Sequence, residues 1–157
     1  MPDSHQPLRT IGVGFHFEDY TEGDRFRTIG RSVTEADITA FVNATGMTES
    51  LFTDLEYVAG HSLLGGRPAP GALVYSFAEG LLMITMQQTG MAFMGMELQM
   101  KGPVLAGDTI HVEVEVTTAR SSATAGRGVV TTRNEVVNQR GETVMVYTPT
   151  RLVKMRG

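Results

Sequence analysis

Apolar and polar residues alternate through much of the second half of the chain. The alternation is cleanest over residues 109–117, where isoleucine and valine alternate with histidine, glutamate and threonine. A period of two is typical of an antiparallel strand with one buried and one solvated face. Residues 91–100 alternate as well, and residues 127–138 and 142–153 have the pattern of a hairpin pair. The pattern therefore predicts four antiparallel strands after residue 90.

The first half of the chain has helical spacing instead. A strand is predicted over residues 24–33, and residues 38–45 then place apolar side chains three and four positions apart. We expect Thr34 to cap this helix, with Asp37 as its capping-box partner and Gly46 as its end.

The longest helix is predicted over residues 72–88. Its apolar positions cover most of the circumference, which is usual for a buried helix; they are Leu73, Val74, Phe77, Ala78, Leu81, Leu82 and Ile84. Residues 60–71, rich in glycine and proline, are expected to form a loop. Because a sheet with an apolar face must be covered, and one long helix can cover it, we expect an α+β fold. In that fold a curved antiparallel sheet wraps around one long central helix.

Composition narrows the class of protein. The length of 157 residues suits a flexible N-terminal tail over residues 1–14 and a single domain over residues 15–157. A formal net charge of −4 without a basic patch argues against a nucleic-acid partner. The absence of cysteine and the four scattered histidines argue against a metal site. No apolar run approaches the ~20 residues that span a bilayer, and the N-terminus lacks a signal-peptide pattern. We therefore expect a cytoplasmic protein with no membrane contact.

Four segments have a familiar sequence: FEDYTEGDRF at 17–26, VTEADITAFVNATG at 33–46, KGPVLAGDTIHVEVEV at 101–116 and EVVNQRGETV at 135–144. Together they resemble the MaoC-like dehydratases, a branch of the hotdog fold that includes R-specific enoyl-CoA hydratases. The resemblance implies an acyl thioester as substrate, carried on CoA or on acyl carrier protein, and no cofactor beyond that CoA. It also implies a homodimer or a higher homo-oligomer, with acyl-thioester sites between two subunits.

The catalytic loop of that family reads Gly-Asp-x-Asn-Pro-x-His and continues x-Asp-x-x-Tyr-Ala. The corresponding stretch here is GMTESLFTDLEY, in which Gly46 and Asp54 match. Met47 stands at the position of the family's Asp, and Phe52 at that of its His. Neither side chain can transfer a proton, so the usual dyad is missing. Two interpretations of Met47 and Phe52 stay open: they line an apolar slot for an acyl chain, or they are core residues.

Other groups are candidates for the missing chemistry. Glu49 stands at the position of the family's Asn, and His61 opens the loop before the central helix. Gly71 follows Pro70 where the family has an Ala-His-Gly turn at the start of that helix. Unpaired N–H groups at a helix N-terminus can bind a thioester carbonyl and stabilise an enolate-like oxygen. Glu49, His61 and Gly71 are therefore the candidate catalytic residues, with Pro70 beside the substrate.

Two further features are candidates for substrate binding. Arg67 lies in the loop before the central helix. Two interpretations stay open: its guanidinium binds a phosphate of CoA or a carboxylate of the substrate, or it is a solvent-exposed charge. Six of the ten methionines lie between residues 83 and 100. Met94, Met96 and Met100, on one strand face, are candidates for an adaptable acyl pocket, and ordinary core packing is the alternative. Asp54 is expected to cap a short helix.

Three functions follow from the resemblance. The first is an enoyl-CoA hydratase or 3-hydroxyacyl-CoA dehydratase in which Glu49 or His61 replaces the dyad. The second is a non-catalytic acyl-CoA binder, or the inactive partner of a catalytic subunit. The third is a hotdog thioesterase that uses Glu79, which falls in the middle of the central helix. A buried carboxylate is costly without a partner, so Glu79 needs either a partner or a role.

Overall fold

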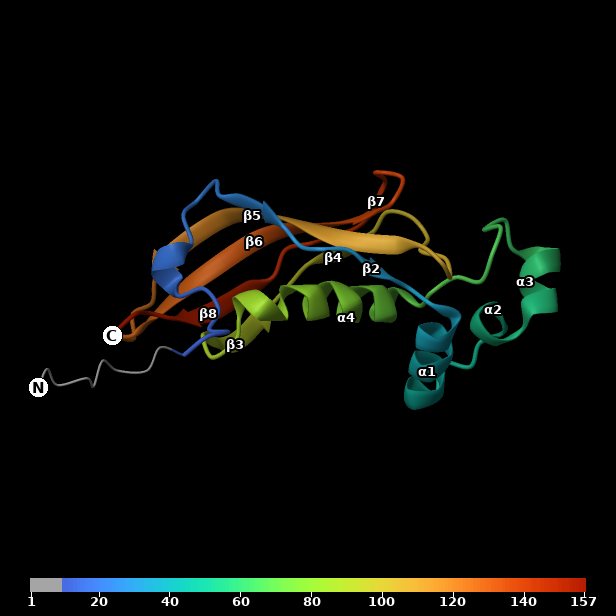
Figure 1. Ribbon diagram of the computed structural model, residues 1–157, viewed down its shortest axis with the longest axis horizontal. Helices are drawn as coiled ribbons and strands as arrows, with labels where there is room; N and C mark the ends of the chain where they lie inside the picture. Colours follow the sequence, from blue (N-terminus) through green and yellow to red (C-terminus); the bar gives the residue numbers. More distant parts are fainter. Residues whose placement is uncertain (1–9) are drawn as a thin grey trace, which may run out of the picture.

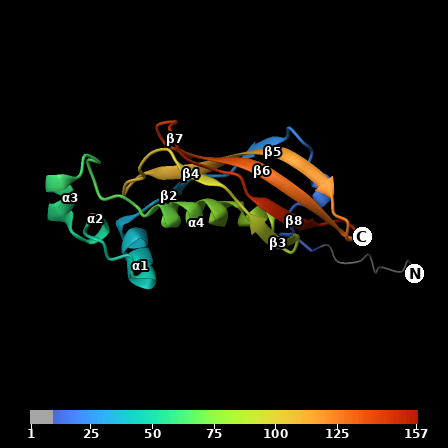
Figure 2. The same cartoon turned by 180° about the vertical axis from the view of Figure 1, so that it is seen from behind.

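The computed structural model describes residues 10–157. An eight-stranded antiparallel sheet curves around one helix, α4 (Gly71–Leu82), which lies along the concave side of the sheet (Figure 1). Three shorter helices gather beyond the N-terminal end of α4, whereas the C-terminus lies at the opposite end of the molecule (Figures 1 and 2). These helices are α1 (Glu35–Thr45), α2 (Ser50–Thr53) and α3 (Leu55–His61). The predicted α+β fold is confirmed.

The sheet has a central run of long strands, with β1 and β2 at one edge and β3 and β4 at the other. Its strands are β1 (Arg25–Arg27), β2 (Arg31–Ser32), β3 (Gly90–Gly95), β4 (Leu98–Met100), β5 (Thr109–Ser121), β6 (Arg127–Asn138), β7 (Thr143–Tyr147) and β8 (Thr150–Lys154). They pair in the order β1-β5-β6-β7-β4, with β2 also on β5, and β8 between β6 and β3. Within the described chain, β3 pairs only with β8 and β4 only with β7, so these two strands present an unpaired edge.

Local signals placed α1 correctly. The side-chain oxygen of Thr34 accepts a hydrogen bond from the Asp37 N–H at 3.1 Å, and the Asp37 carboxylate accepts one from the Thr34 N–H at 2.9 Å. Gly46 ends the helix with a φ of 72°, a conformation that glycine adopts without strain. Asp54 caps α3 as expected, because its carboxylate accepts from the Tyr57 N–H at 2.9 Å.

Other predicted elements differ in length. The strand expected over residues 24–33 is divided into β1 and β2, that over 91–100 into β3 and β4, and that over 142–153 into β7 and β8. The long helix ends at Leu82 and passes through a 3₁₀ turn (Met83–Thr85) instead of continuing to residue 88. Ile84, expected on its buried face, is 74% exposed. After this turn the chain leads into β3 at the edge of the sheet.

The core lies between α4 and the concave face of the sheet. Leu73, Val74, Ala78 and Leu82 of α4 are buried together with side chains from β5, β6 and β7. The opposite face of α4 is exposed at three small residues, Ala72, Ser76 and Gly80. The predicted central helix is therefore buried on the side that faces the sheet and exposed along this strip.

The first described residues lie against the end of the central helix. The Gly14 N–H donates to the Gln87 carbonyl at 2.9 Å, and the Phe15 N–H donates to the Thr85 carbonyl at 2.8 Å. Most of the tail predicted over residues 1–14, including His5, lies outside the described residues. Across residues 10–157, no helix combines the length and apolar character needed to cross a membrane.

Candidate functional site

In the part of the chain that the structure describes, two N–H groups at the N-terminal end of α4 have no acceptor. The Pro70 carbonyl accepts from the N–H groups of Leu73 at 2.9 Å and Val74 at 3.2 Å. Within residues 10–157, no acceptor is paired with the N–H groups of Gly71 and Ala72. Both groups belong to a helix of 12 residues, whose dipole favours negative charge at this end. The arrangement is suited to holding a carbonyl oxygen that becomes more negative during a reaction.

Gly71 packs closely against Met100 at this end of the helix. A methyl group placed on its Cα would lie 3.3 Å from the sulfur of Met100, which comes from the edge strand β4. Met100 therefore lies against the start of α4. Met94 and Met96, which were predicted to line an acyl pocket together with Met100, instead border a shallow groove of about 410 Å³ with Thr148. The structure thus brings Met100, rather than Met94 or Met96, to Gly71.

Phe52 and Met47 occupy different environments. Phe52 is half-buried and packs against the core cluster, whereas Met47 is 37% exposed on the loop between α1 and α2. Arg67 fixes the position of Phe52, because its Nε and Nη2 donate to the Phe52 carbonyl at 3.0 and 2.9 Å.

Arg67 joins three parts of the helical end. Besides Phe52, it contacts α1 through Nη1, which lies 2.6 Å from Glu35 Oε2 and 3.0 Å from Thr39 Oγ1. Its side chain is only 13% exposed. These bonds occupy the guanidinium as a clamp between α1, α2 and the loop before α4. No local pattern indicates this role, because Glu35 lies 32 residues away from Arg67.

Glu49 and His61 lie away from Gly71 on separate short helices. Glu49 is exposed at the start of α2, where its backbone carbonyl accepts from the Phe52 N–H at 2.8 Å. His61 stacks on Tyr57 with ring centroids 4.6 Å apart, at the C-terminal end of α3. Helix α3 forms the outer end of the molecule in both views (Figures 1 and 2). In the described chain, no hydrogen bond joins these two side chains to each other or to Gly71.

Glu79 has two partners beneath α4. The Tyr147 hydroxyl donates to Glu79 Oε1 at 2.9 Å, and the Arg151 guanidinium donates to Glu79 Oε2. The Glu79 and Arg151 side chains are 18% and 13% exposed. Burial raises the pKa of Tyr147, and the negative charge of Glu79 raises it further. The sequence required a partner or a role for Glu79, and the structure supplies the partners.

A cavity of about 690 Å³ lies beside this cluster, between α4 and β3. Its lining is mostly apolar and includes Gly80, Met83, Met91 and Phe93, with Glu79 and Arg151 as its charged members. The sequence did not predict this cavity, because the methionines expected to line an acyl pocket were the later ones, Met94, Met96 and Met100. The available signal was the methionine content of residues 83–91, since Met83, Met86 and Met91 all line the cavity.

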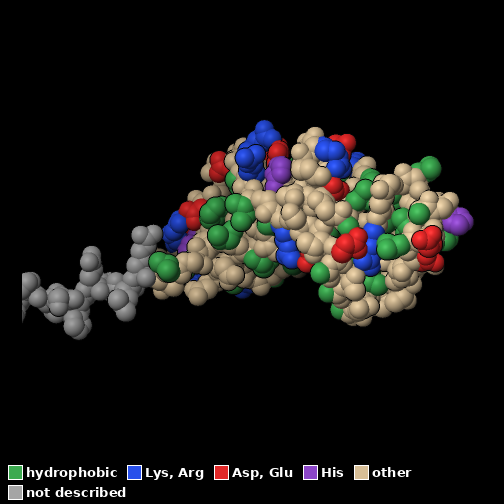
Figure 3. Space-filling view, turned by 45° about the vertical axis from the view of Figure 1, so that its right-hand side comes forward, with side chains coloured by type: hydrophobic (Ala, Val, Ile, Leu, Met, Phe, Trp, Pro, Cys, Tyr) green, Lys and Arg blue, Asp and Glu red, His purple; other side chains and the backbone are tan. Residues whose placement is uncertain are grey.

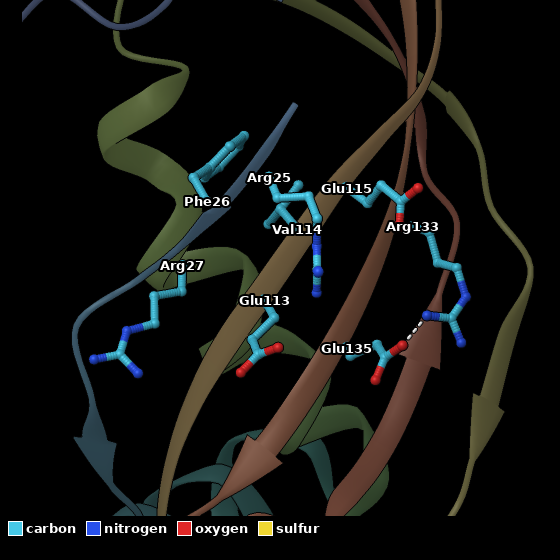
Figure 4. A pocket seen from close by; sticks show the side chains of 8 residues that line it. All are labelled: Arg25, Phe26, Arg27, Glu113, Val114, Glu115, Arg133 and Glu135. Carbon is cyan, nitrogen blue, oxygen red and sulfur yellow. Dashed lines mark hydrogen bonds and ion pairs between the residues drawn. The ribbon is translucent and has the colours of Figure 1, made fainter. Parts of the chain in front are cut away.

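A second hollow lies on the outer face of the sheet. Figure 4 shows three arginines and three glutamates there, from β1, β5 and β6, while Phe26 projects to the other side of the strand. Arg25 stands opposite Glu115 in the strand register, Arg27 stands opposite Glu113, and Arg133 pairs with Glu135. The charges compensate one another, as is usual for a solvated sheet face. Lys/Arg and Asp/Glu side chains also lie side by side on the face shown in Figure 3.

Comparison with known proteins identifies the family of the chain. Residues 21–147 match the family described as the FAS1-like, dehydratase domain region. The protein belongs to the MaoC-like dehydratase family. The solved MaoC-like dehydratase from Rhodospirillum rubrum is 33% identical, over 92% of this chain and 99% of that one, with a TM-score of 0.82.

Two other relatives differ from this chain in length. Protein MaoC of Klebsiella aerogenes is 34% identical over 101 residues, or 63% of this chain, and the match spans only 30% of MaoC. A Mycobacterium tuberculosis protein with a double hotdog fold is 21% identical, over 94% of this chain and 46% of that one. Its TM-score is 0.84, which confirms the hotdog fold.

Proposed function

We propose that this MaoC-like protein binds an acyl-CoA thioester with its carbonyl oxygen on the N–H groups of Gly71 and Ala72. The observation that carries the proposal is this pair of unpaired donors at the end of the 12-residue central helix. Two N–H groups at that position stabilise the oxyanion that forms when a proton is added or removed beside the thioester. Family membership supports enoyl-CoA hydration, or dehydration of the 3-hydroxyacyl thioester, as the reaction.

Glu49 is the proposed acid-base group of that reaction. Its carboxylate is exposed on the loop that carries the dyad in relatives, whereas Asp54 in the same loop is engaged as the cap of α3. His61 is the alternative, although its ring is stacked on Tyr57. Because α2 and α3 lie beyond the end of α4, either group has to reach the thioester by movement of this loop or from a second subunit.

A non-catalytic binder, or the inactive partner of a catalytic subunit, is the second candidate. The clamp of Arg67 on the Phe52 carbonyl favours it, because it holds an apolar side chain where relatives have a proton-transfer group. Hydrolysis by Glu79 has weaker support. Both carboxylate oxygens of Glu79 already accept hydrogen bonds, and attack on a thioester would break the pair with Arg151.

The proposed assembly is a homodimer through the open edge of the sheet. Exposed apolar side chains follow this edge: Met91, Phe93, Met94, Met96, Leu98 and Met100. Pairing of two such edges around a two-fold axis covers these side chains and satisfies the free backbone groups. The cytoplasmic location expected from the sequence belongs to the same proposal.

The reaction is tested with crotonyl-CoA, by following the loss of absorbance of the conjugated thioester. Heat-inactivated protein is the control for non-enzymatic loss. Turnover that disappears in Glu49→Gln supports hydration, whereas full activity in both Glu49→Gln and His61→Ala excludes these two residues. Saturable binding of crotonyl-CoA without any turnover supports the second candidate. Release of free thiol that depends on Glu79 would instead establish hydrolysis.

A further inference from the structure

We propose that a small inner hollow at the C-terminal end of α4 is a water-binding site, in which the Thr132 hydroxyl and the Arg151 guanidinium hold a buried water molecule. The hollow lies between the end of α4 and strands β5, β6 and β8, and Tyr20 and Phe26 complete its wall. Arg151 also borders the larger cavity between α4 and β3, but the two hollows are distinct. The inference does not depend on the proposed function, because the inner hollow lies at the opposite end of α4 from Gly71.

The hydroxyl of Thr132 needs a hydrogen-bond partner that the described chain does not provide. Thr132 is 6% exposed, and within residues 10–157 its side-chain oxygen has no partner. Burial of a hydroxyl without a partner is unfavourable, and buried polar side chains in proteins are nearly always hydrogen-bonded. Because Thr132 lines the inner hollow, its hydroxyl indicates a polar ligand there.

Arg151 supplies hydrogen-bond donors on the same face of the sheet. In the register of β6 and β8, Arg151 stands opposite Val130, and Thr132 follows Val130 by two residues. Side chains two residues apart on a strand point to the same face, so Arg151 and Thr132 are diagonal neighbours. A guanidinium has five N–H donors, and within residues 10–157 one hydrogen bond is formed, to Glu79. The other donors are available to an oxygen atom in the hollow.

The size and charge of the hollow select water as that ligand. Its volume is about 30 Å³, and one water molecule needs roughly 10–15 Å³ of such space. The hollow therefore has room for one or two water molecules and is too small for an organic ligand. The ion pair between Arg151 and Glu79 compensates the positive charge, which disfavours a bare anion.

Two further hydroxyl groups line the hollow, those of Tyr20 and Thr85. The Thr85 hydroxyl donates to the Leu82 carbonyl at 2.7 Å, so its oxygen can still accept a hydrogen bond. A buried water typically makes about three hydrogen bonds. Together with Thr132 and Arg151, the wall provides enough polar groups for a water of this kind.

The water connects the ion pair of Glu79 and Arg151 to the interior of the sheet. A buried polar network is most stable when each of its members has its hydrogen bonds. With the water in place, Arg151 has an oxygen partner from α4, Glu79, and a second one beside Thr132 of β6. The water thus helps to hold the Arg151 side chain in its pairing with the central helix.

The direction of the stability change in Thr132→Val tests the proposal, because valine has nearly the shape of threonine without the hydroxyl. If water is bound, the substitution removes a hydrogen bond, and we expect the unfolding equilibrium constant from urea denaturation to rise about tenfold. A hollow without water predicts the opposite, because removal of an unpaired hydroxyl relieves the cost of its burial. Thr118→Val, at an exposed position of β5, is the control for the change in strand propensity. A Thr132→Val protein as stable as Thr118→Val, or more stable, overturns the proposal.

A high-resolution crystal structure of the wild-type protein locates the water directly. We expect an ordered water within about 3.2 Å of both Thr132 Oγ1 and a nitrogen of the Arg151 guanidinium. Thr132→Ser keeps the hydroxyl and should retain this water. No electron density for a water in the wild-type hollow overturns the proposal, and this measurement decides the question even if Thr132→Val does not fold.

Discussion

Arg67 holds the backbone of Phe52 with two hydrogen bonds, of 3.0 and 2.9 Å, to the same carbonyl oxygen. From the sequence, Arg67 was expected either to bind a phosphate or carboxylate or to be a solvent-exposed charge on a loop. The structure instead uses the arginine to fix the residue that stands where the family resemblance implies a histidine. A planar guanidinium can make both bonds together with its contacts to Glu35 and Thr39, which a lysine ammonium cannot reproduce.

Replacement of Arg67 should therefore loosen the helical end of the molecule. Arg67→Met leaves the Phe52 carbonyl without these donors, and we expect a loss of about 1–3 kcal/mol in the free energy of unfolding. Arg67→Lys should recover only part of this loss. Urea denaturation measures both values. Arg120→Met, at an exposed position of β5, is the control, and an Arg67→Met protein as stable as that control would contradict the clamp.

Alkaline stability tests the cluster beneath α4. The pKa of Tyr147 is raised by burial and by Glu79, so the folded state holds the phenolic proton more tightly than the unfolded state. This stabilisation is complete below the ordinary tyrosine pKa of 10.0 and is lost as pH rises above it. We expect unfolding free energy to fall less steeply above pH ~10 in Tyr147→Phe than in the wild type. Identical pH profiles would show that Tyr147 is not the responsible group.

The same substitution has a cost at neutral pH. Tyr147→Phe removes one of the two donors of the Glu79 carboxylate, which leaves a largely buried oxygen unpaired. We expect a loss of about 1–3 kcal/mol at pH 7, measured by urea denaturation. A variant as stable as the wild type would mean that water replaces the lost hydroxyl.

The open edge of the sheet predicts the oligomeric state. Met94 on β3 is exposed in the single chain, and the proposed dimer covers it. Sedimentation should give twice the mass of one chain for the wild type, and Met94→Lys should shift the protein toward the monomer because it places charges at the paired edges. Ile29→Lys, at an exposed apolar position away from this edge, should leave the mass unchanged. A wild-type monomer would refute the assembly.

The features that were predicted well from the sequence are those that depend on residues close together in the chain. Thr34, Asp37 and Gly46 form and end α1 through contacts only a few positions apart, and strand alternation depends on a period of two. The family resemblance added the hotdog fold, which the comparisons confirm. The division of the strands and the early end of α4 were not predictable from local pattern, because they depend on contacts between segments far apart in the sequence, such as that of Phe15 with Thr85.

The site was less accessible to sequence reasoning. Glu79 was correctly expected to need a partner, but its partners lie 68 and 72 positions further along the chain, at Tyr147 and Arg151. This pairing depends on how β7 and β8 are positioned relative to α4. The hydrophobic periodicity of the sequence does not reveal that arrangement. The position of Gly71 at the start of α4 was predictable, because a helix terminus is a feature that the sequence marks.

The most direct test of the account is calorimetric titration of butyryl-CoA into the wild-type protein and Gly71→Val. The added side chain displaces Met100 and blocks the approach to the two free N–H groups. We predict saturable binding to the wild type and to the control Gly60→Val, with binding at least about tenfold weaker in Gly71→Val. Equal binding by Gly71→Val and wild type, or no saturable binding by the wild type, would contradict the central claim that the end of α4 holds the thioester carbonyl.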